Sequence, residues 1–483
     1  MRAPSHDSTP RPLWILVAFL LVVAAYAMSG VADFSDSALA VPTANSLLYD
    51  GDLDLSEFTH RSGVEAHYGL QEVGGRRVDY FPWLTAVFAI PVVALWDLLS
   101  AVGITTNSAD LVGMTDVAGL QIFAGSTWAA AAAVVLALVA DRLRRMSGEA
   151  MHGQAGDGVL PPLPPSRVLP AYSLVIALGT GLWSTASRGM WQHGPSLLLC
   201  GLAVLCTLRA LEAATQDRRR DALIAAAGLF AGLSYWVRPT NVVLCGVLAL
   251  WLARRRPQAL VPLVGGVAAA MALVVPLNLV LLGTAVPPYF RASRIGWHSD
   301  LPQAVAANLI SPSRGLFVFS PFLVAALVLS GRRLRSSLPH ELQVVVSTFL
   351  LGALGYLVAV SAYGERWWAG ESYGPRFMSE SVVLLAPLAL LAIFGPLPRR
   401  VAWTAGSPRA RLAAAVVVAM VGWSVLAHGQ AALLTEVRCW NKEPTNVDLA
   451  PSRVWGLARP QVTEGLRLVA TGDIAELRGR CLL

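Results

Sequence analysis

Long apolar runs, separated by short arginine-rich loops, recur along this chain of 483 residues. The first run, residues 13–32, has about the 20 apolar residues that a helix needs to cross a bilayer. Hydrophobic residues make up 55% of the chain and charged residues only 14%, a balance that is not typical of soluble domains. We therefore expect an all-α polytopic membrane protein, with membrane lipids among its partners.

The arginines orient these runs. Cytoplasmic loops carry an excess of Lys and Arg, and Arg2 and Arg11 precede the first run. We place residues 1–12 in the cytoplasm, a transmembrane domain at 13–427 and a small external segment at 428–483. This bias also accounts for the net charge of +7, so nucleic acid is not an expected partner. We predict about 11 transmembrane helices, at residues 13–32, 119–140, 168–187, 195–211, 222–236, 239–253, 260–283, 316–330, 340–360, 381–397 and 410–427.

One apolar stretch, residues 81–104, does not fit this alternation. If it crossed the bilayer as well as residues 119–140, the basic cluster at 142–145 would lie outside, against the positive-inside bias. We therefore predict that residues 81–104 make no net crossing. They are expected to form an interfacial or re-entrant helix within an external loop at 33–118.

Residues 222–251 are apolar enough for one long helix, but arginine triplets that belong on the same side flank both of its ends. Pro239 disfavours a helical conformation at Arg238 and prevents a straight continuation, which predicts a hairpin. Each arm has about 15 residues, or roughly 22 Å of helix, less than a bilayer core of about 30 Å. Arg238 is therefore expected below the outer surface, in a cavity lined by protein.

An acidic stretch follows the first apolar run and is expected on the outer face. Asp33 and Asp36 lie within about one helical turn of the membrane, where a carboxylate at the lip of a cavity can act as a general base. The alternative is a solvated acidic loop. Asp50, Asp52 and Asp54 offer hard oxygens to a divalent cation, although a solvated turn is the better interpretation. We assign no metal site and no required cofactor, and leave a divalent cation open.

Several arginines lie on the expected outer side, against the charge bias. An ionised group at membrane depth is energetically costly and is a candidate functional residue. Arginine suits phosphate because its planar fork donates two parallel hydrogen bonds, and neighbouring aromatic rings suit a sugar face or a lipid stem. Interfacial anchors of membrane proteins are the alternative for each residue. The candidate substrate-binding residues are Arg188, His193, Arg238, Arg314, Trp367, Trp368, Glu371, Tyr373 and Arg376.

A carboxylate base facing guanidinium groups is suited to glycosyl transfer from a lipid-linked phospho-sugar. The acceptor hydroxyl gives its proton to the carboxylate and attacks the anomeric carbon, and the lipid phosphate leaves. Each arginine that stabilises the developing charge is worth about 3 kcal/mol. One carboxylate suffices for such an inverting displacement, unlike the paired carboxylates of hydrolases. We expect Asp36 to be the base, with Asp33 as the second candidate.

Six short motifs are spread over the chain: Asp36-Ser-Ala-Leu-Ala-Val-Pro, Phe81-Pro82, Trp191-Gln-His193-Gly-Pro195, Trp236-Val-Arg238-Pro239, Ser311-Pro-Ser-Arg314-Gly and Trp367-Trp-Ala-Gly-Glu-Ser-Tyr-Gly-Pro-Arg376. Together they resemble the glycosyltransferase C (GT-C) superfamily of integral membrane enzymes, near the protein O-mannosyltransferases and the aminoarabinose transferases of lipid A. In such relatives the first external loop often contains Asp-Glu. Here Ser37 follows Asp36, so this motif lacks its second carboxylate.

The resemblance implies a polyprenyl-phosphate sugar donor and an active site on the external face of a bacterial plasma membrane. The acceptor would be a glycan, lipid or protein of the cell envelope. Two other function classes stay open: a transporter or flippase of lipid-linked intermediates, and a non-catalytic partner subunit with the same fold. A transporter would bind its substrate near the midplane. Asp97 is the one carboxylate within an apolar run, and the other polar groups crowd one face, which disfavours transport.

The five cysteines fall into two groups. Cys200, Cys206 and Cys245 lie in apolar runs and are expected to be buried thiols. Cys439 and Cys481 lie in the segment 428–483. If that segment is external, its compartment permits a disulfide between them.

Overall fold

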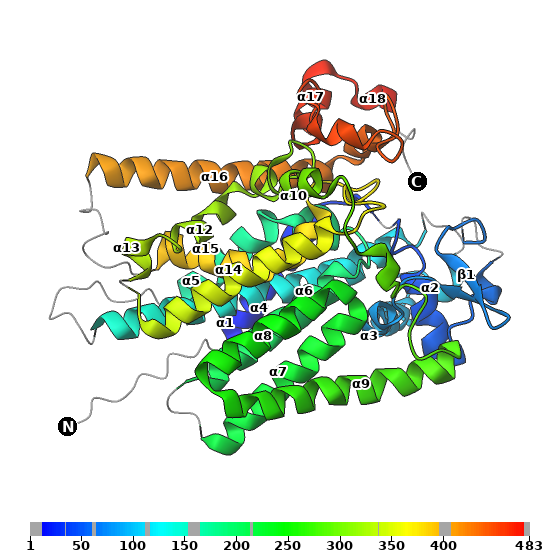
Figure 1. The fold of residues 1–483 in the computed structure, drawn as a ribbon. Helices are drawn as coiled ribbons and strands as arrows, with labels where there is room; N and C mark the ends of the chain where they lie inside the picture. The colour runs from blue at the N-terminus through cyan, green and yellow to red at the C-terminus, as the bar shows by residue number, and fades with distance from the viewer. Residues whose placement is uncertain are drawn as a thin grey trace.

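The computed structural model describes residues 12–33, 35–59, 64–111, 116–152, 165–212, 216–336, 338–395 and 407–477. Apolar helices form a bundle, with a region of short elements at one end and a helical C-terminal segment beside it (Figure 1). Seven helices of the described residues are long and apolar enough to cross a membrane. The chain is a multi-pass, all-α membrane protein, as predicted.

The first part of the chain carries a small antiparallel hairpin on a helical frame. Gly74 and Gly75 form its turn with φ of 60° and 79°, which glycine adopts without steric cost. The register pairs Leu70 with Asp79 and Val73 with Arg76. The elements of this part are α1 (Pro12–Ala27), α2 (Ala40–Asn45), η1 (Ser46–Asp50), η2 (Ser56–Phe58), β1 (Leu70–Val73), β2 (Arg76–Asp79), α3 (Leu84–Ala101) and η3 (Ser108–Asp110).

The middle of the chain forms one side of the bundle, and small residues let its helices approach closely. A Cβ at Gly228 would lie 2.1 Å from the carbonyl oxygen of Leu263, and one at Gly266 would lie 2.0 Å from that of Ala225. The pair α7 and α9 is therefore tightly packed. The elements are α4 (Ala118–His152), α5 (Pro165–Leu178), η4 (Leu182–Ala186), α6 (His193–Ala210), α7 (Asp217–Val237), η5 (Pro239–Asn241), α8 (Val242–Arg255), η6 (Pro257–Ala259) and α9 (Leu260–Leu282).

The last part of the chain completes the bundle and adds the C-terminal segment. Its elements are η7 (Ala292–Arg294), α10 (Leu301–Ile310), α11 (Leu316–Phe319), η8 (Pro321–Val324), α12 (Ala325–Val328), α13 (Arg332–Arg335), α14 (His340–Ser361), η9 (Arg376–Ser381), α15 (Val382–Phe394), α16 (Pro408–Leu433), η10 (Thr435–Asn441), η11 (Pro451–Trp455), η12 (Gln461–Thr463), α17 (Glu464–Thr471) and α18 (Ile474–Leu477).

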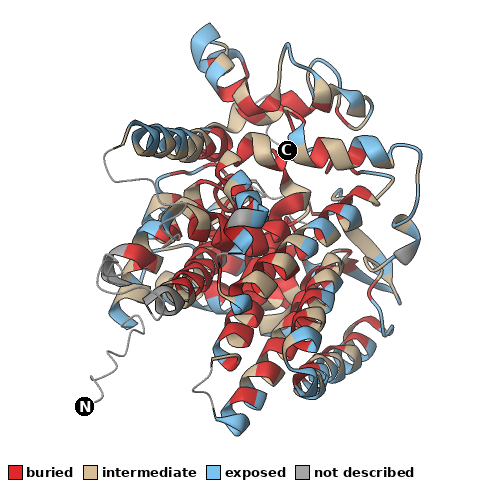
Figure 2. Ribbon diagram, turned by 60° about the vertical axis from the view of Figure 1, so that its left-hand side comes forward, coloured by how far each residue is buried: buried red, intermediate tan, exposed pale blue. Residues whose placement is uncertain are grey.

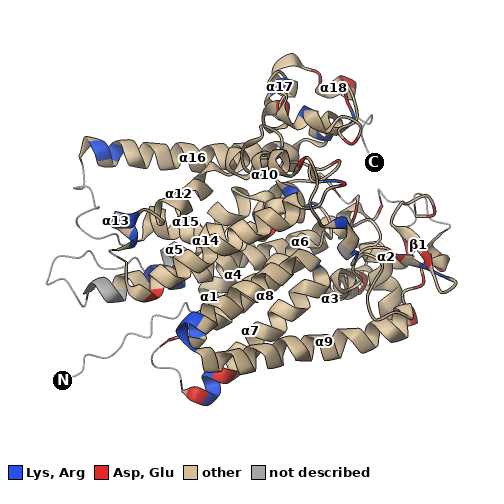
Figure 3. Ribbon diagram, in the orientation of Figure 1, with Lys and Arg blue, Asp and Glu red and all other residues tan. Residues whose placement is uncertain are grey.

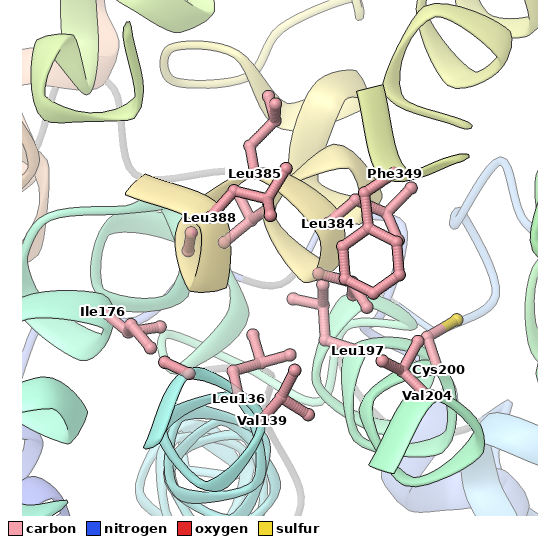
Figure 4. Close-up of a cluster of buried hydrophobic side chains, with 14 of the residues drawn as sticks. Leu136, Val139, Ile176, Leu197, Cys200, Val204, Phe349, Leu384, Leu385 and Leu388 are labelled. Carbon is pink, nitrogen blue, oxygen red and sulfur yellow. The ribbon is translucent and has the colours of Figure 1, made fainter. Parts of the chain in front are cut away.

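The largest apolar cluster lies where α4, α5, α6, α14 and α15 meet (Figure 4). Leu136, Leu197 and Leu384 are fully or almost fully buried there. Figure 2 shows the buried residues gathered in the centre of the bundle and the exposed ones along its outer helices. The apolar exterior of these outer helices suits lipid contact, since lipid tails solvate such side chains as well as a protein core does.

The predicted number of 11 spans is not confirmed, because seven helices of the described residues meet the length and apolarity of a span. Residues 316–330, predicted as one span, are instead broken into α11, η8 and α12. The break falls at Ser320, directly before Pro321, which lacks a backbone N–H for the helix ladder. The predicted span 381–397 ends at residues that lie outside the described part of the chain, which has gaps at 153–164 and 396–406.

Helix α3 covers most of the stretch predicted to make no net crossing. Figure 1 shows α3 nearly end-on, whereas α9, α14 and α16 run across the view. This direction is the one expected of an interfacial helix. Since α3 is also long and apolar enough to cross, its position relative to the bilayer stays a prediction.

The hairpin predicted around Arg238 is present. Helix α7 ends at Val237, Arg238 is extended with φ −150° and ψ 113°, and Pro239 opens η5, after which α8 returns. Figure 3 shows the basic ends of α7, α8, α13 and α16 together at one end of the bundle. The hairpin apex therefore lies toward the other end, where α2 and β1 are found.

The C-terminal segment begins after α16 ends at Leu433 rather than at residue 428, because the helix continues through His428 and Gln430, which are buried. It packs on the loop 362–375 through a cluster that includes Trp367, Trp440 and Val454. Glu464 is buried and forms ion pairs with Arg459 and Arg467.

Cys439 of this segment is disulfide-bonded, and Cys481 lies outside the described residues. We predict that the pair is Cys439–Cys481. Intact mass should increase by two hydrogens after reduction and denaturation, and peptide mapping without reductant should recover these two cysteines joined. Five free thiols in the purified protein would contradict the prediction.

Candidate active site

A pocket opens where the first loop region meets the ends of α6, α7 and η9. Four of the predicted site residues line it: Asp36, His193, Arg238 and Arg376. The other described lining residues are Ser37, Ala40, Asp79, Phe81, Pro82, Thr85, Ala86, Met190, Trp191, Gln192, Tyr289 and Phe377. Segments from six parts of the chain therefore converge on one cavity.

Asp36 is held between two hydrogen-bond donors. Nη1 of Arg376 donates to its Oδ2 at 2.7 Å, and the Tyr68 hydroxyl donates to its Oδ1. Burial raises the pKa of Asp36, but the Arg376 charge and these hydrogen bonds outweigh it and hold the pKa below its usual range. The side chain is 29% exposed. Asp36 is therefore an ionised carboxylate with access to the pocket.

A buried glutamine fixes the loop that carries Asp36. Gln121 of α4 donates from Nε2 to the carbonyl oxygens of Ser37 and Ala38, at 3.1 and 3.2 Å, and its Oε1 accepts from the Met190 amide at 2.9 Å. The loop before α6 is thereby joined to the acidic loop. His67, whose Nε2 lies 2.8 Å from the Ser35 carbonyl oxygen, ties the hairpin region to the same loop.

Arg376 is oriented by a ring and a carbonyl. Its guanidinium lies 4.9 Å from the centroid of Trp191, and its Nη2 donates to the Ala369 carbonyl at 3.0 Å. Ala369 has a φ of 67°, a conformation that costs energy for a residue with a Cβ and is often kept at functional sites. The Nε of Arg376 is buried without a hydrogen-bond partner among the described residues, which is uncommon for a buried donor.

Arg238 is paired with a carboxylate that the sequence analysis did not select. Its Nε lies 3.2 Å from Oε2 of Glu380, and Oε1 of Glu380 lies 3.2 Å from Nδ1 of His193. Nη1 of Arg238 contacts the same His193 nitrogen at 2.9 Å. Glu380 is fully buried. The only sequence signal for it is a lone carboxylate directly before an apolar run.

Further hydrogen bonds connect this group to the bundle. Ser196 donates to Glu380 Oε1 at 3.3 Å and accepts from Asn241 Nδ2 at 2.8 Å. Tyr356 of α14 donates to Asn241 Oδ1 at 2.9 Å. Three helices therefore fix the direction in which Arg238 enters the pocket.

Asp79 brings a second carboxyl group to the pocket from the end of β2. Its Oδ1 accepts from the Phe81 amide at 3.0 Å. Burial, reinforced by the nearby charge of Asp36, raises the pKa of Asp79 to about 8. Sequence reasoning missed this residue because it is distant from Asp36 along the chain. Ser37 stands where related sequences often have a second carboxylate. In this chain Asp79 brings a second carboxyl group to the same pocket as Asp36.

The raised pKa of Asp79 predicts that the folded protein becomes less stable as the pH rises. From about pH 4 to about pH 8 the folded chain keeps a proton that the unfolded chain has lost, so raising the pH favours unfolding. Asp79→Asn should flatten this dependence in thermal unfolding of the detergent-solubilised protein, whereas Asn at the exposed Asp110 should not. An unchanged slope in Asp79→Asn would contradict the assignment.

Two of the predicted arginines lie outside the pocket and contact backbone carbonyls. Arg188 is buried and donates to the carbonyl oxygens of Ser29 and Tyr26 at 3.1 and 3.0 Å, which caps the end of α1. Arg314 is buried and donates to the carbonyl oxygens of Trp368 and Gly370 at 2.7 and 3.0 Å, and also to side chains of the C-terminal segment. Neither lines the pocket.

The other predicted residues also lie outside the pocket lining. Their contacts are with the C-terminal part of the chain: Asp33 pairs with Arg438 at 3.6 Å, Trp368 donates to Asp448, Glu371 accepts from Asn446, Tyr373 donates to the Ala427 carbonyl, and Trp367 packs against Trp440. The motif at 367–376 therefore divides, with its last arginine at the pocket and the preceding residues at the C-terminal segment.

The acidic turn at 50–54 is satisfied by the chain itself. Asp52 Oδ1 accepts from the Ser46 hydroxyl and the Asp54 amide, both at 2.9 Å, and Asp54 Oδ1 accepts from the Arg77 amide at 3.1 Å. Among the described residues no group of three or more His, Cys, Asp or Glu side chains is placed to hold a metal ion.

No family model and no curated protein matches the chain by sequence, but solved structures match it in three dimensions. The oligosaccharyltransferase of Archaeoglobus fulgidus, solved with a tethered acceptor peptide, matches with a TM-score of 0.50 at 13% identity, over 92% of this chain and 59% of that one. That protein is a GT-C membrane glycosyltransferase. The chain has a GT-C-like fold. The resemblance in the sequence motifs is confirmed at this level.

The GT-C-like chain spans about three fifths of the length of the archaeal enzyme, 59%. It is also similar to ArnT from Cupriavidus metallidurans, solved with undecaprenyl phosphate, at a TM-score of 0.48 and 12% identity, over 96% of this chain and 76% of that one. At these identities the likeness concerns the fold, and the chemistry rests on the pocket.

Proposed function

We propose that the chain transfers a sugar from a polyprenyl-phosphate donor to a hydroxyl of a cell-envelope acceptor, on the external face of the membrane. The contact between Asp36 and Arg376 carries this proposal, because it joins a candidate base to a candidate phosphate ligand at 2.7 Å. Helix α2, which contributes Ala40 to the pocket lining, lies toward the end of the bundle away from the arginine-rich ends (Figure 3). The positive-inside bias supports that end as the external one.

In this mechanism Asp36 accepts the proton of the acceptor hydroxyl as the oxygen attacks the anomeric carbon. The lowered pKa keeps Asp36 ionised at neutral pH, and it can take the proton because the hydroxyl becomes acidic as the new bond forms. The reaction inverts the anomeric centre. The sugar–phosphate bond breaks, and its electron pair leaves with the lipid phosphate.

Arg376 and Arg238 would hold the lipid phosphate and stabilise its growing charge. The unpartnered Nε of Arg376 supplies a donor that is already oriented by Trp191 and Ala369. Arg238 is oriented by Glu380 and His193, so it needs no rearrangement before the reaction. Trp191, Phe81 and Tyr289 line the same pocket and suit a sugar face.

The proposal is tested by incubating purified protein in liposomes with radiolabelled polyprenyl-phosphate sugars and a cell-envelope extract. Label should move to the acceptor fraction, with inversion at the anomeric carbon. Movement of intact donor between the leaflets without any transfer would instead identify a flippase. The absence of both transfer and donor binding, for every sugar tested, would contradict the proposal.

A further inference from the structure

A second hollow lies at the opposite, arginine-rich end of the bundle, between the ends of α8 and α14. It is lined by Arg254 of α8, Arg335 of α13, and His340, Gln343, Val344 and Ser347 of the first two turns of α14. Among the described residues no carboxylate lines it. Figure 3 shows the basic ends of α8 and α13 at the same end of the bundle.

The described residues around this hollow provide no carboxylate that pairs with its two arginines. The nearby carboxylate of Glu341 is paired with Arg255, whose Nη1 also lies 2.7 Å from Nδ1 of His340. Arg254 and Arg335 are exposed, and among the described residues no ion pair joins either of them to a carboxylate. Two guanidinium groups from different elements thus face one open space without a counter-ion.

The start of α14 adds to the attraction for an anion. Its N-cap, Pro339, provides no side-chain acceptor for the amides of the first turn. Such free amides, at the positive end of the helix dipole, favour a negative group. The two arginines and the helix end therefore act on the same ligand.

An apolar stripe leads from the hollow along the outer surface of α14. Val344 and Ser347 line the hollow, and Leu351, Leu354 and Val358 follow at alternating spacings of three and four residues, which places all five on one helix face. These three apolar side chains are 47%, 53% and 51% exposed. A basic pocket at one end and an apolar track at the other match the two parts of a phospholipid.

We propose that this hollow binds the phosphate headgroup of an anionic phospholipid, whose acyl chains lie along α14. Arginine is suited to phosphate by its donor fork, and basic pockets between transmembrane helices on the cytoplasmic side are known to select anionic headgroups. The apolar stripe favours a lipid over free phosphate. The site is independent of the glycosyl-transfer proposal.

The test compares the wild type with the double variant Arg254→Ala/Arg335→Ala in nanodiscs of phosphatidylcholine doped with cardiolipin. The control is Arg218→Ala/Arg219→Ala, which removes two exposed arginines at the same end outside the hollow. Retention of cardiolipin by native mass spectrometry should be about 30-fold weaker or more in the double variant, because it loses two charged hydrogen-bond donors to the phosphate. The control loses only general surface attraction, so its retention should change far less.

Equal loss in both double variants would show general surface attraction and overturn the site. Binding of millimolar inorganic phosphate at this hollow, with no retention of cardiolipin there, would overturn the assignment to a lipid. A thermal unfolding midpoint equal to that of the wild type shows that the double variant is folded, so undiminished cardiolipin retention in it would also overturn the proposal.

Discussion

Asp36→Asn is expected to lower the rate of sugar transfer by about 10²–10⁴-fold, the usual range for a general base. The amide keeps the size of the side chain but accepts no proton at neutral pH. Donor binding should persist, because the phosphate ligands are arginines and Asp36 contributes no donor. The measurement is single-turnover transfer from saturating labelled donor, with donor binding followed separately.

The matched control is Asp33→Asn, three residues away. Asp33 pairs with Arg438 and does not line the pocket, so its transfer rate should stay within a few-fold of the wild type. Full activity in Asp36→Asn, or an equal loss in Asp33→Asn, would contradict the assignment of the base.

Glu380→Ala is expected to destabilise the folded protein by about 3–5 kcal/mol, the usual cost of breaking a buried ion pair. The variant leaves Arg238 without its carboxylate in a site where Glu380 is 1% exposed. It also removes the acceptor of Ser196 and the partner of His193. Equilibrium unfolding in mixed micelles measures the change in free energy.

Two further variants test whether the effect is specific to the buried Glu380–Arg238 pair. Glu371→Ala removes an exposed carboxylate that accepts from Asn446 and should change the free energy of unfolding by less than about 1 kcal/mol. Glu380→Gln keeps the shape, so it should fold and weaken donor affinity through a misplaced Arg238. A Glu380→Ala protein as stable as the wild type would show that the pair does not hold Arg238.

Local chemistry made much of the fold predictable. Pro239 and the two flanking arginine triplets required a hairpin, and the hairpin is present. Span counting was less successful, because hydropathy does not register a break such as that at Ser320. The end of α16 was placed too early for a similar reason, since its last two turns contain His428 and Gln430, which lower the hydropathy although they are buried.

Site residues could be predicted where an ionised side chain at membrane depth costs free energy. Arg238 and Arg376 were selected because a charge at membrane depth needs a reason, and both line the pocket. Arg314 was selected for the same reason, but its guanidinium donates hydrogen bonds to backbone carbonyl oxygens. A sequence does not distinguish a guanidinium that binds a ligand from one that binds a carbonyl. Asp79 approaches Asp36, and Glu380 pairs with Arg238, only in the folded chain. No spacing along the sequence reveals either contact.

The most direct test of the account is the position of a polyprenyl phosphate in a solved complex. The account predicts a phosphate oxygen at about 2.7–2.9 Å from a guanidinium nitrogen of Arg376 or Arg238, with Asp36 facing the carbon that the sugar would occupy. A phosphate held elsewhere on the chain, with both arginines still engaged only by Asp36 and Glu380, would contradict it.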